Sequence, residues 1–597
     1  MLLTKSFYNR ALLRSDLRRI WPLLGGYTLL WLLILPMHLL RELGEVAPEF
    51  AASSNQYVLE DALYATNWIG LLAGLLLAAS LFSYLTSIRA TYGLHSLPVS
   101  RGCQFRTHVL CGVGGVVCCN VLITVLTVLV QLGSGVPCGK TLSWLVCATV
   151  TFLLYFALGV LSCMLCGWMP AAVVAYGALN CIVLAAQVLV NMLCDIFYPS
   201  YNDSLFNIAS DSLVCWFTPA LRLHASLNTV ALYARDAENA GLSAMWQSLL
   251  VYGIAAVVLL VAGALLYTIR RSECSGNTVA FKPLRPVVRW LVGLLGGLGL
   301  GVVFAALIGN TQDFALLLIC SVILGLACMT GAQMLIAKTP RVFKKLWPEL
   351  IALWLVIAAL CTCMEKDVFG YENRIPRPEQ VESVVVTGMW RGSCVVTEPD
   401  EIALVRQAHA YLQEHSDDVY NTGTGGTFTL TYALKDGSTL SRRYFIEDEN
   451  RAGVLPMLEM DSFRRSVVMD RSGLIKPDGR PAIPSPQLKA EDLRIGYWDY
   501  NGQQQELTRE QVQALYTAIV ADAAAMDMSK VDLRGDDYCR MYIHLRNLDN
   551  DIYVDLYPNR QCTRTLQLLQ DWGIIERPDD ILTAETYTDE YNAALLN

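Results

Sequence analysis

VLITVLTVLV, residues 121–130, decides the fold class. Taken alone, this apolar run rich in valine and threonine is typical of a buried β-strand, and the following stretch, QLGSGVPCGKTLSW at residues 131–144, contains a Gly-Lys-Thr like that of a phosphate-binding loop. The uncharged stretch that contains residues 121–130, however, extends from about residue 108 to residue 132. That length is too great for one strand and suits a helix that crosses a bilayer core of roughly 30 Å. We therefore interpret it as a membrane span.

The Gly-Lys-Thr sequence does not complete a phosphate-binding loop. The motif requires a glycine, four residues and then Gly-Lys, so its first glycine should stand at position 134, which is Ser134. Gly133 and Gly135 each miss that register by one residue. No second nucleotide-binding motif occurs, and we predict that this chain is not an ATPase and has no catalytic, cofactor-binding or metal site.

Composition divides the chain into two parts. Of its 597 residues, 54% are hydrophobic and 16% charged, with a mean hydropathy of +0.39, whereas soluble domains carry about 25% charged residues. Residues 1–365 hold 21 lysines and arginines against 15 acidic residues, and residues 366–597 hold 24 against 38. Such asymmetry indicates two environments. We predict an apolar membrane domain followed by an acidic soluble domain.

Repeated apolar runs of span length occupy the first part. They predict nine helical spans at about 20–40, 65–86, 108–132, 143–166, 169–194, 247–268, 289–309, 313–337 and 347–364. Basic residues concentrate in loops on the cytoplasmic side. With the N-terminus inside, 17 of the 21 lysines and arginines fall on that side. The same orientation places residues 379–597 outside the cytoplasm, after a linker at 365–378.

Two basic segments lie on the predicted cytoplasmic side. FYNRALLRSDLRRIWPLL, residues 7–24, predicts a basic amphipathic helix over residues 1–19. This helix precedes span one and the membrane domain, which extends over residues 20–364. Anchoring by charge alone explains this segment equally well. SIRATYGLHSLPVSRGCQFRTH, residues 87–108, joins spans two and three, and Pro98 disfavours helix at Leu97. By composition it is a charged connector in which Ser96 or Ser100 can cap a short helix.

SLPVSR near the end of the second span, with a basic amphipathic N-terminus, resembles the ABC-2-type permease subunits of bacterial ABC transporters, most closely those of Gram-positive Firmicutes. In that family this loop contacts a separate ATPase subunit. The resemblance implies a plasma-membrane permease whose partners are ATPase subunits, a second identical or different permease chain, and lipid. Its ATPase-coupling segment comprises Arg89, Ser96, Leu97, Pro98, Val99, Ser100, Arg101 and Arg106. The resemblance covers about the first 350 residues, although many such permeases have six spans.

The spans themselves favour an external energy source. They hold almost no ionisable residues, so a relay for proton or sodium coupling is absent from the sequence pattern. Glycines at four-residue spacing predict close helix packing, either as a static seam or as a gliding interface; these are Gly70, Gly74, Gly293, Gly297 and Gly301.

The C-terminal domain has a mixed pattern. A strand at 381–388, a helix at 398–415 and a hairpin around Lys435-Asp436-Gly437 are followed by a second helix at 507–526, a second hairpin at 539–559 and a helix at 564–574. The recurrence of helix and hairpin predicts a weakly repeated α+β domain whose halves are joined by KPDGRPAIPSP, residues 476–486. Asp549, Asp551 and Asp555 lack the central glycine of a calcium loop, so they indicate a solvated strand face.

We therefore expect a polytopic permease of an ATP-driven transporter, an exporter in preference to an importer, with no nucleic-acid partner. One alternative is a membrane sensor whose outer domain binds a peptide or cell-wall fragment, although its inner loops are short for an output domain. A membrane-embedded transferase is a further alternative, which would use outer-loop acids such as Glu42, Glu60 and Asp61.

Overall fold

The chain folds into two compact units. The computed structural model describes residues 7–202, 212–232, 238–309, 313–388, 393–415, 426–446, 451–470, 489–500, 503–531, 538–539, 541–546 and 553–583. The membrane unit comprises residues 1–192 and 205–361, and the α+β unit comprises residues 193–204 and 362–597. The linker predicted at 365–378 therefore belongs to the α+β unit.

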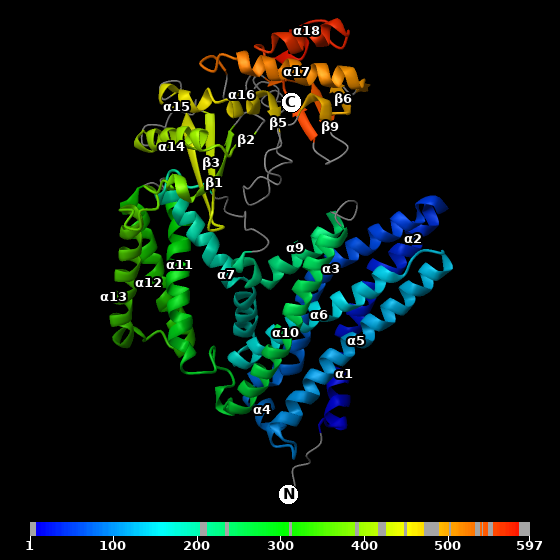
Figure 1. Cartoon of the computed structure of the whole chain (residues 1–597). Helices are drawn as coiled ribbons and strands as arrows, with labels where there is room; N and C mark the ends of the chain where they lie inside the picture. Colours follow the sequence, from blue (N-terminus) through cyan, green and yellow to red (C-terminus); the bar gives the residue numbers. More distant parts are fainter. Residues whose placement is uncertain are drawn as a thin grey trace, which may run out of the picture. The chain divides into compact units, whose positions relative to one another are not determined.

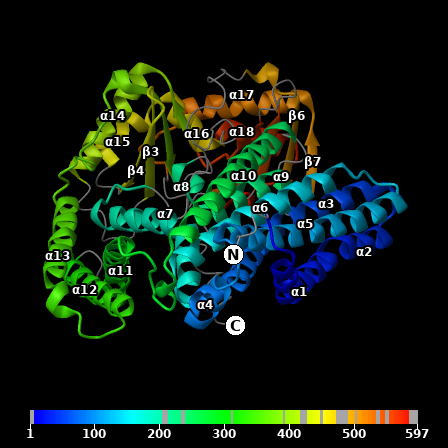
Figure 2. The same cartoon turned by 90° about the horizontal axis from the view of Figure 1, so that it is seen from below.

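The membrane unit is helical (Figures 1 and 2). Its helices are α1 (Arg10–Leu32), α2 (His38–Glu45), α3 (Ala51–Phe82), α4 (Ile88–His95), α5 (Arg101–Gly133), α6 (Gly139–Leu165), α7 (Met169–Phe197), α8 (Leu213–Trp216), α9 (Pro219–Leu232), α10 (Glu238–Ile269), α11 (Leu284–Ile308), α12 (Phe314–Ala337) and α13 (Phe343–Glu365). In the described part of the chain, nine helical stretches are long and apolar enough to cross a membrane. This confirms the predicted multi-pass membrane protein with nine spans.

The first span begins earlier than expected. Asn9 caps α1, because its Oδ1 atom accepts the N–H groups of Ala11 and Leu12 at 3.0 Å each. From Arg10 the helix runs without a break through residue 20, where a surface helix was expected to turn into the span. It continues through a π-helical turn, Leu33–Met37, into α2. Pro36 lies in that turn, where it lacks the N–H group that a regular helix needs.

Spans one to six share one buried core, which draws its residues from Ile20 to Tyr267. Among the described residues, this core includes none from α11, α12 or α13. These three helices lie side by side (Figures 1 and 2). At one end, Arg289 of α11 donates to Gln333 Oε1 of α12 at 2.6 Å and pairs with Glu349 of α13 at 2.5 Å. The last three spans therefore form a three-helix group with its own ion pair.

The five predicted packing glycines all lie at helix–helix contacts. A Cβ atom on Gly74 of α3 would lie 2.6 Å from the backbone carbon of Tyr155 in α6, and one on Gly70 would lie 3.0 Å from Thr151. In α11, a Cβ on Gly293 would lie 3.0 Å from Met329, and one on Gly297 would lie 2.5 Å from the Cα atom of Gly325 in α12. A Cβ on Gly301 would lie 2.6 Å from the Cα atom of Ser321. The contacts of Gly74, Gly297 and Gly301 with a neighbouring backbone leave no room for a Cβ, whereas those of Gly70 and Gly293 are with side-chain atoms.

The predicted α+β fold is confirmed, and each of the two predicted hairpins lies in an antiparallel sheet of its own. The elements of the α+β unit are β1 (Val381–Gly388), β2 (Cys394–Val396), α14 (Pro399–Glu414), β3 (Gly426–Leu434), β4 (Thr439–Ile446), α15 (Arg451–Leu458), α16 (Asp461–Val468), β5 (Met469–Asp470), β6 (Ile495–Tyr500), β7 (Gln503–Leu507), α17 (Arg509–Ala525), β8 (Tyr538–Cys539), β9 (Tyr542–Arg546), β10 (Tyr553–Leu556), α18 (Thr563–Asp571) and β11 (Leu582–Thr583). The strand orders are β2-β1-β3-β4 and β5-β10-β9-β6-β7, and β8 and β11 form a third small pair.

These strand orders confirm the internal repeat. In the first half a hairpin, β1–β2, precedes α14 and the hairpin β3–β4; in the second, β6–β7 precedes α17 and the hairpin β9–β10. The pairing β2-β1-β3-β4 is matched by β7-β6-β9-β10, with β5 added at the edge. The hairpin β6–β7 and the helices α15 and α16 were missing from the sequence prediction. Asp549 and Asp551 lie outside the described residues, whereas Asp555 lies in β10 and pairs with His544 at 2.6 Å.

The halves differ in what holds the helix to the sheet. His409 of α14 is fully buried and its two ring nitrogens lie 3.0 Å from the hydroxyl groups of Tyr432 and Tyr444. Counted from the helix N-cap, the corresponding residue of α17 is Ile519, which is buried in the apolar core. Burial, with Arg442 and Arg406 nearby, lowers the pKa of His409 to about 3.

The buried His409 predicts that the stability of the α+β unit falls in acid. The folded state binds the His409 proton less readily than the unfolded chain, whose histidine pKa is about 6.5, so stability is retained above that pH and falls as the pH drops toward 3. We expect hydrogen exchange of α14 in the full chain to accelerate between pH 7 and pH 5. In the His409→Gln variant, which keeps a donor and an acceptor without titrating, that acceleration should shrink. An unchanged pH profile would contradict the assignment.

The contact of Gly297 with α12 predicts that a large side chain at this position destabilises the membrane unit. Gly297→Leu should force α11 from α12 and cost about 1–3 kcal/mol of stability, as overpacking does. Gly299→Leu is the matched control, since nothing lies within 4 Å of a Cβ at that position. The melting temperature of each variant in detergent measures the effect. Equal melting temperatures for the two variants would show that the contact at Gly297 is unimportant.

Candidate functional site

The segment between spans two and three is compact and mostly helical. A 3-10 turn, Ser83–Thr86, ends the second span and leads into α4. Residues 96–100, between α4 and α5, are non-helical, consistent with the effect of Pro98 on Leu97. Ser100 caps α5, because its Oγ atom accepts the N–H of Cys103 at 3.3 Å. Ser100 therefore caps the long helix of span three, where a short helix was predicted.

The predicted coupling residues differ in exposure. Arg89, Ser96, Leu97, Pro98 and Arg106 are exposed, whereas Val99, Ser100 and Arg101 are half-buried. Two apolar side chains that the sequence prediction did not single out, Ile88 and Tyr92, lie one helical turn apart on α4 and are 55% and 53% exposed. With Leu97, which is 44% exposed, this segment has three exposed apolar side chains.

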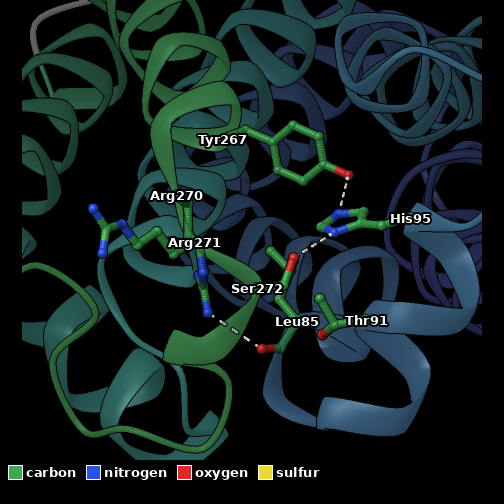
Figure 3. Close-up of a pocket in the computed structure, with 7 residues that line it drawn as sticks. All are labelled: Leu85, Thr91, His95, Tyr267, Arg270, Arg271 and Ser272. Atoms are coloured by element: carbon green, nitrogen blue, oxygen red, sulfur yellow. Dashed lines mark hydrogen bonds between the residues drawn. The ribbon is translucent and has the colours of Figure 1, made fainter.

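His95, in the last turn of α4, contacts the end of α10 through a hydrogen-bonded cluster (Figure 3). His95 Nε2 lies 3.2 Å from the Tyr267 hydroxyl, and His95 Nδ1 lies 3.0 Å from Ser272 Oγ. Tyr267 donates to Gln104 Oε1 at 3.0 Å and accepts from Tyr84 at 2.8 Å. A phenol has one donor hydrogen, so we assign the Nε2–H form to His95, with Nδ1 accepting from Ser272.

This cluster favours a neutral imidazole. Burial, with the positive charges of Arg101 and Arg270, lowers the pKa of His95. The pocket between these residues leaves no room for a water molecule. The polar groups therefore satisfy one another, and the cluster is a packed junction between helices, without space for a ligand.

Two arginines pair with carbonyl groups at the ends of the neighbouring helices. Arg101, at the start of α5, donates from Nη1 to the carbonyl oxygens of Arg270 at 2.7 Å and Thr268 at 3.3 Å, at the C-terminal end of α10. Arg270 is buried and donates from Nη1 to the carbonyl oxygens of Cys163 at 2.6 Å and Met164 at 3.0 Å, in the last turn of α6.

The same arginine reaches a third helix end. Arg270 Nη2 donates to the carbonyl oxygen of Leu85, just after α3, at 3.2 Å (Figure 3). The last carbonyl groups of a helix have no partner within the helix, and cations near them are favourable. We call Arg101, Arg270 and the carbonyl groups that they bind the arginine junction. It joins the ends of α3, α5, α6 and α10.

The start of α5 is also bound to the N-terminal segment. Arg106 donates from Nε to the carbonyl oxygen of Phe7 at 3.2 Å and lies over the Phe7 ring. Thr107 Oγ1 accepts the N–H of Asn9 at 3.1 Å, and His108 Nδ1 lies 2.7 Å from Asp16. Asp16 and His108 are both buried. The segment from α4 to the first turns of α5 is therefore held from two sides.

Most of this site was not predicted from the sequence. Arg270 was counted only among the basic residues that set the orientation, and no role was predicted for His95, Tyr267 or the pair of Asp16 and His108. Their signal is weak, because each is a single polar residue near the end of an apolar run. A basic pair directly after a span, Arg270-Arg271, was the only usable indication.

Comparisons of the chain with protein-family models, with curated proteins and with solved structures found no match. The function of the site therefore has to be inferred from its geometry.

The arginine junction predicts that substitution of Arg270 destabilises the protein much more than substitution of the adjacent Arg271. Arg270→Met removes the donors from three carbonyl groups, and each buried group left unpaired costs about 1–3 kcal/mol. We expect a clear fall in the melting temperature of the full chain. Arg271→Met is the control, since this exposed side chain points away from His95 (Figure 3). Equal stability of both variants would contradict a structural role for Arg270.

Proposed function

We propose that this chain is the permease subunit of an ATP-binding-cassette transporter, coupled to separate ATPase subunits through residues 87–108. The observation that carries this proposal is that the segment combines exposed apolar side chains with hydrogen bonds to the end of α10. Arg270, just after α10, in turn binds carbonyl groups at the end of α6 and just after α3. Such a segment can receive a force and distribute it.

The mechanism follows from those bonds. A partner that presses on Ile88, Tyr92 and Leu97 displaces α4, and His95 passes the displacement to Tyr267 and Ser272. Arg101 and Arg270 are short, charge-assisted links, so the ends of α3, α5, α6 and α10 move with the segment. ATP binding and hydrolysis in the partner supply the work, and this chain carries out no chemistry of its own.

The remaining parts of the proposal follow the charge distribution and the resemblance of SLPVSR. The N-terminus and residues 87–108 face the cytoplasm of a bacterial cell, and the α+β unit lies outside. The transport direction is export. A second permease chain, identical or different, and membrane lipid complete the set of partners. Labelling of residues in the α+β unit on intact cells tests this orientation, which shielding of that unit would refute.

The coupling surface predicts a specific loss of partner binding. We expect Tyr92→Ser combined with Leu97→Ser to reduce co-purification of a nucleotide-binding subunit from native membranes about tenfold or more, because a buried apolar side chain of this size contributes roughly 1.5–3 kcal/mol. Quantitative mass spectrometry of the purified complex measures the ratio of the two subunits. Arg101→Ala is unsuitable here, since Arg101 also stabilises α10.

Trp168→Ser supplies the control. Trp168 is 46% exposed and lies in the predicted cytoplasmic turn between α6 and α7, outside the coupling segment. This variant should keep its partner. If the wild-type chain retains no nucleotide-binding subunit, the transporter proposal fails. If the double variant retains as much as the wild type at equal stability, the coupling surface lies elsewhere.

A further inference from the structure

An edge strand of the α+β unit is covered by the chain that follows span five. β4 is the last strand of the first sheet, and an uncovered edge strand exposes unpaired N–H and carbonyl groups. Here Arg443 donates its N–H to the carbonyl oxygen of Ser200 at 2.8 Å, and Tyr201 forms a β-bridge with Arg442. Asn202 Nδ2 adds a bond to Ser441 Oγ at 2.8 Å. Residues 200–202 thus extend the sheet.

A buried arginine lies at the centre of this contact. Arg442 is 0% exposed, and its guanidinium carbon lies 4.0 Å from the centre of the Tyr371 ring. It donates to the carbonyl oxygens of Tyr371 at 2.5 Å and Ser441 at 2.9 Å. The rings of Tyr198 and Tyr201 lie 4.9 and 6.1 Å from that of Tyr371. A buried cation needs such partners, so Arg442 joins three separate stretches of chain.

The chain that leaves span nine is held at the same place. Glu372 Oε1 accepts the N–H of Ser200 at 3.2 Å, and Gln413 of α14 donates to the Glu372 carbonyl oxygen at 2.9 Å. The Asp367 carboxylate accepts the N–H groups of Tyr371 at 2.6 Å and Glu372 at 2.9 Å. The stretch after α13, predicted as a polar linker, is therefore bound within the α+β unit.

Both connections are short. Tyr198 directly follows the last residue of α7, and Tyr371 comes six residues after the end of α13. We propose that residues 198–202, with Arg442 and Tyr371, form a strap that fastens the α+β unit to spans five and nine together. The unit then follows displacements of α7 and α13, where a single flexible linker would leave it free. This proposal concerns the chain alone and does not depend on an ATPase partner.

Hydrogen exchange of the full chain tests the strap. In Arg442→Met, which keeps the aliphatic stem, exchange should rise roughly tenfold or more in both 193–202 and 367–374, with β1 still protected. Arg443→Met is the matched control, because its side chain makes only a 3.5 Å ion pair with Asp195 at the surface. Wild-type exchange in both segments of Arg442→Met would overturn the proposal.

A second variant covers the case in which Arg442→Met also exposes β1, which would mean that the sheet has unfolded. Tyr201→Ser with Asn202→Ala alters only residues 198–202. It should raise exchange in 193–202 and in β4 while β1 stays protected. If residues 193–202 and β4 both exchange at the wild-type rate in this variant, the strap does not exist.

Distance distributions test the mechanical consequence. Spin labels are placed at Val190 in α7 and at Lys435 in the β3–β4 turn. They are attached through a keto amino acid, because the chain has nineteen cysteines. The distance between the two labels should show one narrow distribution in the wild type and in Arg443→Met. Both positions are exposed. Arg442→Met should broaden the distribution. A broad distribution in the wild type would show that the α+β unit moves independently of span five.

Discussion

Unpaired carbonyl groups at the ends of membrane helices are the constraint on which the rest of this structure depends. A bilayer offers no water to bind them, so each buried helix end needs a partner from elsewhere in the chain. Arg270 supplies it for α6 and for the stretch after α3, and Arg101 supplies it for α10. Because each arginine comes from a different helix end, satisfying the carbonyl groups also ties four helices together. Because Arg101 lies in the segment between spans two and three, this segment is bound to the same helices.

Two kinds of contact hold the helices of the membrane unit together. Glycines permit close approach along the lengths of α3 and α6, and of α11 and α12, where backbone meets backbone. Contacts of charged side chains lie near helix ends, as in the arginine junction and in the ion pair of Arg289 with Glu349. Spans one to six share one core, whereas α11 to α13 hold together separately among the described residues. Six spans with a shared core and a separate group of three helices together make up the nine spans of the described chain.

The α+β unit shows how one topology accommodates different chemistry. Its two halves share the order of strands and helices, yet His409 with its two tyrosines occupies the place that Ile519 fills by apolar packing. The halves are also joined, since β5 follows the helices of the first half and pairs with β10 of the second. In the first sheet, residues 200–202 cover the edge strand β4. At β4 and at β10, distant stretches of chain therefore pair with a strand of a sheet.

The sequence by itself determined the nine spans, the two-part organisation and the repeated α+β pattern, because length, hydropathy and residue periodicity are local properties. It also located the glycines at close contacts and the turn at Pro98. Only the tertiary structure decided which carbonyl groups Arg101 and Arg270 bind, that His95 meets Tyr267, and that Arg442 joins three stretches of chain. Those partners lie tens to hundreds of residues apart, and no local pattern records which helix ends become neighbours. For buried polar groups, the partner follows from packing, and packing is a property of the whole fold.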